Sequence, residues 1–261
     1  MKGDTRIRSS SSHIELHVHY RIVDEEGRLP TILFSHGFTV DGTESHRMFL
    51  KVADGYNEKG FNTVLFDHRG CGYSDGSFED FIFSSAVEDI RVVAEWVKKT
   101  LAGRSRSLVI HGQSLGTAIA AVAFHESPMV EAFVLWNLSA QIYDRYLKML
   151  GTNILKTGKA CVEQKGFFVR QAFLEDVKSY NILRFFENWN RPILFVSSGA
   201  DTLGNPEFAE QAAKTVGEIG KRVVIDGAHH SFRCQPELED QAIQESIKWV
   251  STISSRKDAE Q

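Results

Sequence analysis

Residues 112–116 read G-Q-S-L-G and lie between an apolar run, residues 108–110, and a run of small residues at 117–121. The apolar run suits a buried strand, and the small residues are compatible with a helix. A serine between a buried strand and a helix must lie on a sharp turn, where glycines two positions to either side remove Cβ atoms that would clash. The stretch therefore predicts a strand, a tight turn carrying Ser114, and a helix.

Ser114 is the candidate nucleophile. The turn would present its hydroxyl at the end of the strand, above the N-terminus of the next helix, where negative charge is stabilised. A G-x-S-x-G stretch also occurs by chance in unrelated chains, so the flanking strand and helix carry the argument. A serine hydroxyl is a weak nucleophile at neutral pH, and it needs a base together with an acid that orients this base.

The acid is expected from a loop that follows a late strand. Asp201 comes shortly after the apolar run 193–196. The carboxyl ends of parallel strands meet at one edge of a sheet, so Asp201 can lie beside Ser114. Asp226 is a rival, but it lies on the strand side of its turn, and residues 135–139 contain no carboxylate. Asp201 is therefore the first candidate for the acid.

The base is expected after the last strand. Residues 227–232 follow the apolar run 223–225 and read G-A-H-H-S-F, which places His229 and His230 at the same edge. The chain contains 10 histidines, so position rather than residue type selects these two. From the residues alone, either histidine can serve as the base.

Strand-like and helix-like segments alternate along the chain, which predicts an α/β fold with a mostly parallel sheet and helices on both faces. Residues 14–23 and 31–34 are expected as an antiparallel opening pair, and Ser85 is expected to begin a helix through a capping box. Residues 1–13 lack the apolar core of a signal peptide, so we expect a flexible tail. The other expected strands are 61–66, 108–110, 132–135, 193–196 and 223–225, and Pro236 is expected to begin the last helix.

Residues 141–188 separate two expected strands by more than a crossover helix requires, which predicts an inserted cap. The core would then comprise residues 14–140 and 189–255. Aromatic side chains of the cap are candidates for lining a substrate cavity, although each could equally pack the cap onto the sheet. The candidates for substrate binding are Tyr143, Tyr146 and Phe168.

Composition favours one soluble domain of enzyme size. The chain has 261 residues, of which 42% are hydrophobic and 25% charged, and its formal net charge is −4. It contains neither a long stripe of Lys and Arg nor an apolar stretch of the roughly 18 residues that span a membrane, so we expect no nucleic-acid or membrane partner. Three widely spaced cysteines, Cys71, Cys161 and Cys234, suit a reducing compartment, and we expect a cytoplasmic protein.

Residues 227–232 resemble the terminal G-x-G-H-S-F pattern of the α/β-hydrolase superfamily, with histidine in the third position. The resemblance extends from about residue 14 to residue 250, and it implies the α/β-hydrolase fold with a cap. It also places the base at His230, in the chain order serine, acid, histidine.

Two further segments resemble the same superfamily. Residues 36–38, H-G-F, are similar to its H-G-x segment, which implies that the backbone N–H groups of Phe38 and Leu115 form the oxyanion hole. Residues 67–74 are similar to its D-x-R-G-x-G-x-S segment, which implies that Asp67 and Arg69 shape a loop beside the site without a catalytic role.

Within the superfamily, the chain most resembles the feruloyl and cinnamoyl esterases and related small bacterial carboxylesterases. The resemblance rests on H-G-F-T at 36–39, S-D-G at 74–76, the size of the cap and F-L-E-D-V at 173–177. The turn departs from that group, which usually has H-S-x-G-G, because here Gln113 precedes Ser114. This departure puts a preference for aromatic acids in doubt.

These features predict a serine carboxylesterase that hydrolyses small to medium acyl or aromatic-acid esters through an acyl-enzyme intermediate. Thioester hydrolysis, lipase-like hydrolysis of fatty acyl substrates and amide cleavage are alternatives within the same machinery. A non-catalytic member of the fold that binds a ligand is an alternative of another class. We expect a small-molecule ester as substrate and neither a metal nor an organic cofactor. The oligomeric state is not predicted.

Overall fold

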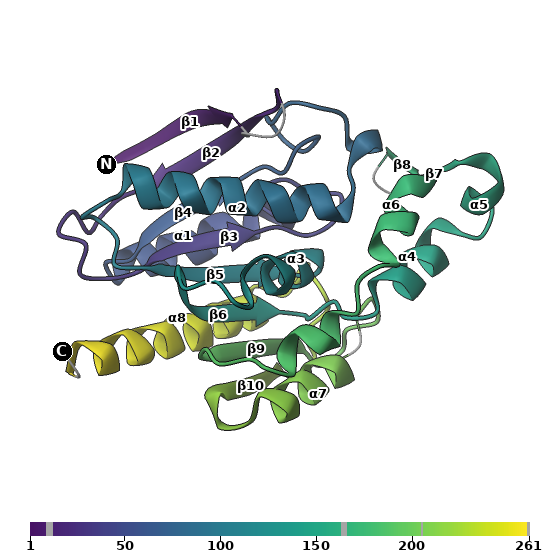
Figure 1. Cartoon of the computed structure of the whole chain (residues 1–261). Coiled ribbons are helices and arrows are strands. Elements are labelled where there is room, and N and C mark those ends of the chain that lie inside the picture. Colours follow the sequence, from purple (N-terminus) through teal and green to yellow (C-terminus); the bar gives the residue numbers. More distant parts are fainter. Residues whose placement is uncertain (9–12, 163–165, 205, 260–261) are drawn as a thin grey trace.

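The computed structural model describes residues 1–8, 13–162, 166–204 and 206–259. Its main feature is an eight-stranded sheet in the order β1-β2-β4-β3-β5-β6-β9-β10 (Figure 1). The six strands from β4 to β10 are parallel, whereas β1 and β2 run antiparallel to their neighbours. The strands are β1 (Lys2–Arg8), β2 (Glu15–Arg21), β3 (Thr31–Ser35), β4 (Asn62–Phe66), β5 (Leu108–Gln113), β6 (Val130–Trp136), β9 (Ile193–Ser198) and β10 (Gly220–Ile225).

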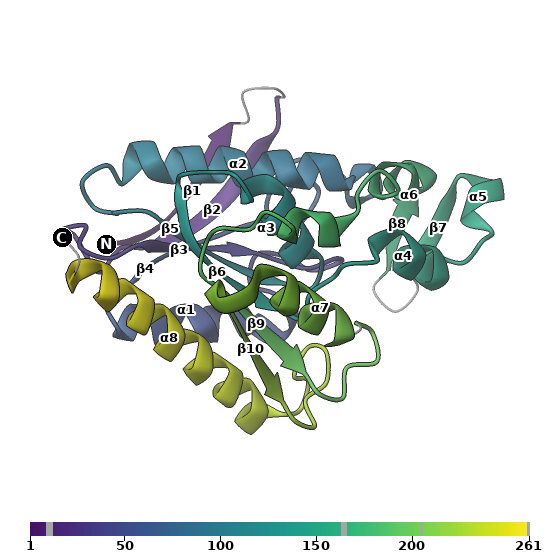
Figure 2. The same ribbon diagram turned by 60° about the horizontal axis from the view of Figure 1, so that its bottom comes forward.

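Helices cover both faces of this sheet (Figures 1 and 2). On one face, α2, α3 and α7 pack on residues such as Leu33 and Ile110, and on the other face α1 and α8 pack on Ile32 and Phe34. Every residue of β3, β4, β5 and β6 is buried, as expected for parallel strands between two helical layers. The helices are α1 (Met48–Glu58), α2 (Phe83–Thr100), α3 (Leu115–Phe124), α7 (Pro206–Val216) and α8 (Pro236–Ala259), and short 3₁₀ turns are η1 (Ser45–Arg47), η2 (Phe78–Asp80), η3 (Ile182–Phe186) and η4 (Gly217–Ile219).

This architecture confirms the predicted fold class, because the later strands and the strand–turn–helix around Ser114 form as expected. The predicted antiparallel opening pair is wrong. β2 pairs with β1 and β4, whereas β3 lies inside the sheet, parallel to β4 and β5. Burial explains the difference, since the five apolar-rich residues of β3 are buried on both faces and need two neighbouring strands.

The expectation of a flexible tail is also wrong for residues 2–8. These residues form β1, which pairs along its whole length with β2, and Arg6 and Arg8 form ion pairs with Glu15. Only Ile7 of this strand is buried, so its composition resembles that of a tail although its backbone is paired. The serine run at residues 9–12 lies outside the described residues.

Residues between β6 and β9 form a separate group of small elements, which we call the cap (Figure 1). The cap contacts the rest of the chain through α6 against α2, through β8 against η2, and through η3 against α3 and α7. The Asp176 carboxylate accepts a hydrogen bond from the backbone N–H of Ser84 at 2.7 Å and so caps α2. The capping box predicted at Ser85 is therefore wrong, and α2 begins at Phe83. The elements are α4 (Ile142–Leu150), α5 (Ile154–Thr157), β7 (Lys159–Val162), β8 (Phe167–Arg170) and α6 (Gln171–Val177), followed by η3.

Candidate active site

Ser114 occupies the turn between β5 and α3, with φ 53° and ψ −121°. This left-handed region is costly for a residue with a side chain, and such strain often accompanies functional sites. The close packing requires glycine on both sides, because a Cβ on Gly112 would lie 2.9 Å from the Gly116 carbonyl oxygen, and one on Gly116 would lie 1.9 Å from the Ser35 carbonyl oxygen. The turn thus presents the Ser114 hydroxyl at the carboxyl edge of the sheet.

His230 and Asp201 complete a hydrogen-bonded chain with Ser114. The His230 Nε2 atom lies 2.9 Å from the Ser114 Oγ atom, and its Nδ1 atom lies 2.7 Å from the Asp201 Oδ2 atom. Asp201 comes from the loop after β9 and His230 from the loop after β10. The three side chains that the sequence singled out therefore meet at one edge of the sheet.

The environment of Asp201 favours its ionised form. Burial alone would raise the pKa of this carboxyl, but the hydrogen bond with His230 and bonds from the backbone N–H groups of Leu203 and Gly204 lower the pKa below its usual value of 3.8. The Asp201 side chain is only 3% exposed and that of His230 11%. A buried carboxylate in this position can hold the imidazole in one tautomer and stabilise its protonated form.

The rival residues lie elsewhere. His229 is exposed, and its Nδ1 atom lies 3.5 Å from the Ala200 carbonyl oxygen. Its backbone N–H donates to the Gln235 side chain, which fixes the turn. Asp226 is also exposed. Of the two adjacent histidines, the structure brings only His230 into contact with Ser114.

Two amide side chains that the sequence analysis missed hold the His230 loop in place. Gln113 and Asn137 each donate a hydrogen bond to the His230 carbonyl oxygen, at 2.8 and 2.7 Å. Asn137 also accepts a bond from the backbone N–H of Ser198 at 2.7 Å and adopts φ 54°, which asparagine tolerates better than most residues. Position could have flagged Gln113, because it directly precedes the candidate nucleophile.

The segment expected to provide one oxyanion-hole amide lies against Ser114. A Cβ on Gly37 would lie 3.4 Å from the Ser114 Cβ atom, and the Gly37 N–H donates to the Glu44 carboxylate at 2.7 Å. The Phe38 ring stacks on Phe173, with ring centroids 4.9 Å apart. Within the described residues, the backbone N–H groups of Phe38 and Leu115 donate no hydrogen bond. The oxyanion hole stays a prediction.

Arg145 of α4 reaches into the site, and the sequence analysis did not anticipate it. Its Nη2 atom lies 3.4 Å from both the Ser114 Oγ atom and the His230 Nε2 atom. Its Nη1 atom donates to the Ser139 hydroxyl at 3.3 Å, and its guanidinium lies 5.7 Å from the centroid of the Tyr146 ring. The cap thus places a cation directly beside the hydroxyl and the imidazole. No local sequence pattern marks this role, because Arg145 is one of several charged residues on α4.

The three aromatic residues predicted to bind substrate have different surroundings. Tyr146 is buried between Phe38 and Phe173, and burial raises its pKa to about 12. Tyr143 is half-buried, and Lys178 lies over its ring. Phe168 is 48% exposed on β8, with the Lys159 ammonium 5.1 Å from its centroid. Phe168 and Tyr143 therefore contact lysines at the cap surface, and Tyr146 belongs to the packing beneath it.

A cavity of about 550 Å³ lies near Ser114, His230 and Asp201, between α4 and the loop that follows Asp201. It is large enough for a small organic molecule. A Cβ on Gly204 in its wall would lie 3.6 Å from the His230 Nδ1 atom, which places the cavity against the site. Its lining includes Ser139, Asp144, Arg145, Lys148, Leu203 and Phe208.

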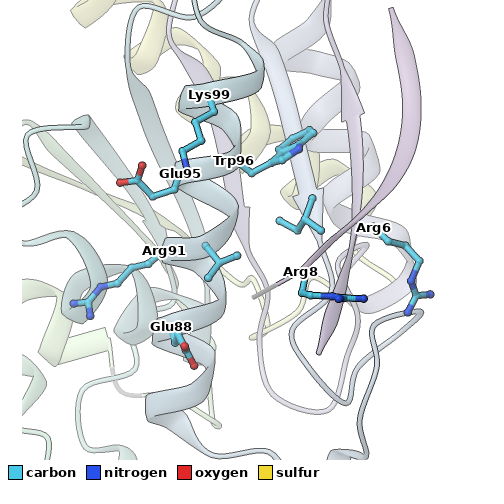
Figure 3. A pocket seen from close by; sticks show the side chains of 9 residues that line it. Arg6, Arg8, Glu88, Arg91, Glu95, Trp96 and Lys99 are labelled. Carbon is cyan, nitrogen blue, oxygen red and sulfur yellow. The ribbon is translucent and has the colours of Figure 1, made fainter. Parts of the chain in front are cut away.

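A second cavity, of about 720 Å³, lies between β1 and α2 (Figure 3). Four of its charged residues have structural partners, since Arg6 and Arg8 pair with Glu15, Arg91 donates to the Val122 and Ala123 carbonyls of α3, and Glu88 pairs with Arg69. Ser114, His230 and Asp201 line neither cavity, but the first contains Arg145, which contacts Ser114 and His230, and Gly204, whose N–H donates to Asp201. The loop of Arg69 is fixed in the same way, because this arginine pairs with the buried Asp89 of α2 rather than with Asp67. These contacts stabilise the fold outside the site.

Within the described residues, no helix has both the length and the apolar character required to cross a bilayer. Among the same residues, no three His, Cys, Asp or Glu side chains cluster as metal ligands would.

Comparison with known proteins agrees with the geometry. A family model described as "alpha/beta hydrolase fold" matches residues 30–145. Among solved structures, Est1E from Butyrivibrio proteoclasticus with ferulic acid bound is similar with a TM-score of 0.82 and 22% identity, covering 95% of this chain and 99% of that one. The Pyrococcus furiosus esterase Pf2001 is similar with a TM-score of 0.66 and 18% identity, covering 98% and 91%.

Curated relatives match over shorter segments. An abhydrolase domain-containing protein of Dictyostelium discoideum is 32% identical over 90 residues, which are 34% of this chain and 22% of that protein. The AB hydrolase superfamily protein YisY of Bacillus subtilis is 26% identical over 125 residues, which are 47% and 43%. The chain thus matches less than half the length of these relatives. The fold and the matched segment agree, because the chain has the α/β-hydrolase fold and residues 30–145 carry the sequence similarity to that family.

Proposed function

We propose that the protein is a serine esterase that hydrolyses small carboxylic esters through an acyl-enzyme intermediate. One observation carries the proposal, namely the hydrogen-bonded chain from Ser114 through His230 to Asp201 at 2.9 and 2.7 Å. Nucleophile, base and orienting acid in this geometry are what acyl transfer requires. The adjacent cavity of about 550 Å³ supports a small-molecule substrate.

In the first half of the reaction, the Ser114 Oγ atom attacks the ester carbonyl carbon and the His230 Nε2 atom takes the hydroxyl proton. The Asp201 carboxylate stabilises the resulting imidazolium. The N–H groups of Phe38 and Leu115 bind the negative charge on the former carbonyl oxygen. Collapse of this intermediate breaks the bond to the alcohol oxygen, which takes the proton from His230, and leaves the acyl group on Ser114.

In the second half, His230 removes a proton from a water molecule that attacks the acyl carbon. The tetrahedral intermediate forms in the same hole, and its collapse breaks the bond to the Ser114 Oγ atom. That oxygen takes the proton back from His230, and the carboxylic acid leaves. The cycle consumes one water molecule and one ester and regenerates the starting protonation states.

The test is a substrate panel measured with the wild-type protein and with Ser114→Ala. The panel contains p-nitrophenyl esters of graded chain length, methyl ferulate, an acyl-CoA and an aminoacyl anilide, which separate ester, thioester and amide hydrolysis. We expect ester turnover by the wild type and a loss of about 10⁴-fold or more in Ser114→Ala, with an unchanged Tm. Failure of the wild type on every ester, or a variant that retains several per cent of the activity, would contradict the proposal.

A further inference from the structure

The charge of Arg145 has no direct ion-pair partner within the described residues, although the buried Glu44 carboxylate, which accepts the Gly37 N–H, and the Asp201 carboxylate lie near the site. Its polar contacts are the Ser114 and Ser139 hydroxyls and the His230 imidazole, and none of the described carboxylates forms an ion pair with its guanidinium. Asp144 and Lys148 line the same cavity with opposite charges, so together they do not compensate it. A half-buried cation without a partner is unfavourable, and it attracts an anion.

The contacts that Arg145 does make are weak. They measure 3.3–3.4 Å, whereas a guanidinium and a carboxylate usually approach to about 2.7–2.9 Å. Two of its nitrogen atoms point toward different neighbours, Nη1 toward Ser139 and Nη2 toward Ser114. An incoming carboxylate can therefore replace these contacts with shorter, charge-assisted bonds to the planar fork.

Proton transfer to His230 also adds a positive charge beside this guanidinium. When His230 takes the proton of Ser114, a positive charge develops on an imidazole whose Nε2 atom lies 3.4 Å from the Arg145 Nη2 atom. Two cations at this distance repel each other, and the Asp201 carboxylate bound to the far side of the imidazole offsets part of this repulsion. A negative group bound to Arg145 removes this repulsion during turnover.

We infer that Arg145 is a specificity-determining residue that binds a carboxylate on the acyl part of the substrate, so that the enzyme prefers monoesters of short dicarboxylic acids. The short distance from Nη2 to the Ser114 Oγ atom limits the separation between the two carbonyl carbons of the substrate to a few bonds. A succinate monoester has a suitable length. The inference rests on the proposed esterase function and names its substrate class.

The experiment compares two methyl esters of the same shape by pH-stat titration of the acid released. Monomethyl succinate carries the carboxylate, and methyl 4-methylpentanoate carries an uncharged isopropyl group in its place. The variants are Arg145→Met, which keeps length without charge, and Arg145→Lys, which keeps charge without the fork. Matched controls from the cap are Lys159→Met, which removes a cation at the cap surface outside the cavity, and Phe168→Ala beside it.

We expect the wild type to prefer the succinate ester by at least about tenfold in kcat/KM. Arg145→Met should lose on the order of 100-fold on the succinate ester and gain several-fold on the neutral ester, because the opposing charge is gone. Arg145→Lys should show a preference for the succinate ester between those of the wild type and Arg145→Met. Both control variants should keep the wild-type preference. A wild type that prefers the neutral ester, or an equal loss on both esters in Arg145→Met, would overturn the inference.

A binding measurement separates this inference from the proposed function. In the Ser114→Ala background, isothermal titration should detect monomethyl succinate, and the further change Arg145→Met should weaken its Kd by at least about tenfold. If neither ester is turned over but this difference in binding appears, the esterase proposal fails and the carboxylate site stands. If both esters are turned over and the two Kd values are equal, the carboxylate site fails alone.

Discussion

The two halves of the site differ in origin and in how firmly they are held. Ser114, Asp201 and His230 come from loops at the ends of sheet strands and contact one another at 2.7–2.9 Å, with the His230 loop fixed by two further hydrogen bonds. Arg145 comes from the cap and contacts this group at 3.4 Å. The loops of the sheet therefore fix the reacting atoms, and the cap contributes a positive charge that a ligand can bind.

The largest expected effect lies in the sheet half. His230→Ala should lower kcat by about 10⁴-fold, because among the described residues the only other side chain that contacts the Ser114 Oγ atom is Arg145, a cation that cannot accept its proton. His229→Ala should lower it by less than about tenfold, since His229 is exposed and contacts only loop atoms. Steady-state kinetics on a neutral p-nitrophenyl ester measures both. The reverse ranking would move the base to His229.

An intermediate effect is expected at Asn137. Asn137→Gly removes the side-chain bonds to the His230 loop while tolerating φ 54°, so the backbone conformation is kept. We expect kcat to fall by about tenfold with KM little changed, because Gln113 still holds the same carbonyl. A fall in Tm with unaltered kcat would show that Asn137 supports the fold and does not position the base.

The smallest effect is expected where the cap meets the core. Asp176→Ala in α6 removes the hydrogen bond to the N-terminus of α2 and should lower the free energy of unfolding by about 1 kcal/mol. Glu175→Ala on the exposed side of α6 should lower it by less than about 0.5 kcal/mol. Urea denaturation compares the two. Equal losses in the free energy of unfolding would mean that the Asp176 contact does not help to attach the cap to the core.

The sheet half could be predicted from the sequence because its signals are local. The strand–turn–helix around Ser114 is contiguous, and Asp201 and His230 each follow an apolar strand. Parallel topology then brings the strand ends together without any knowledge of side-chain contacts. His229 was excluded only by the structure, since neighbouring residues on a turn point in different directions.

The cap half could not be predicted residue by residue, because its positions depend on how short elements rotate on the core. The aromatic residues of α4 suggested a cavity lining, yet Tyr146 is buried beneath the cap and Arg145, its neighbour, faces Ser114. The carboxylate that accepts a hydrogen bond from the N-terminus of α2 belongs to Asp176, which lies far along the chain from Ser84. Polar β1 looked like a tail because pairing of its backbone leaves no mark on composition.

Labelling with a fluorophosphonate tests the central claim most directly, because an activated serine hydroxyl attacks its phosphorus readily, with loss of fluoride. Intact-mass measurement should show one adduct per wild-type chain, and fragmentation of the tryptic peptide 107–145 should place it on Ser114. The adduct should be absent from Ser114→Ala and form far more slowly in His230→Ala. An unlabelled wild type, or an adduct on another residue that persists in Ser114→Ala, would contradict the assignment of Ser114 as the nucleophile.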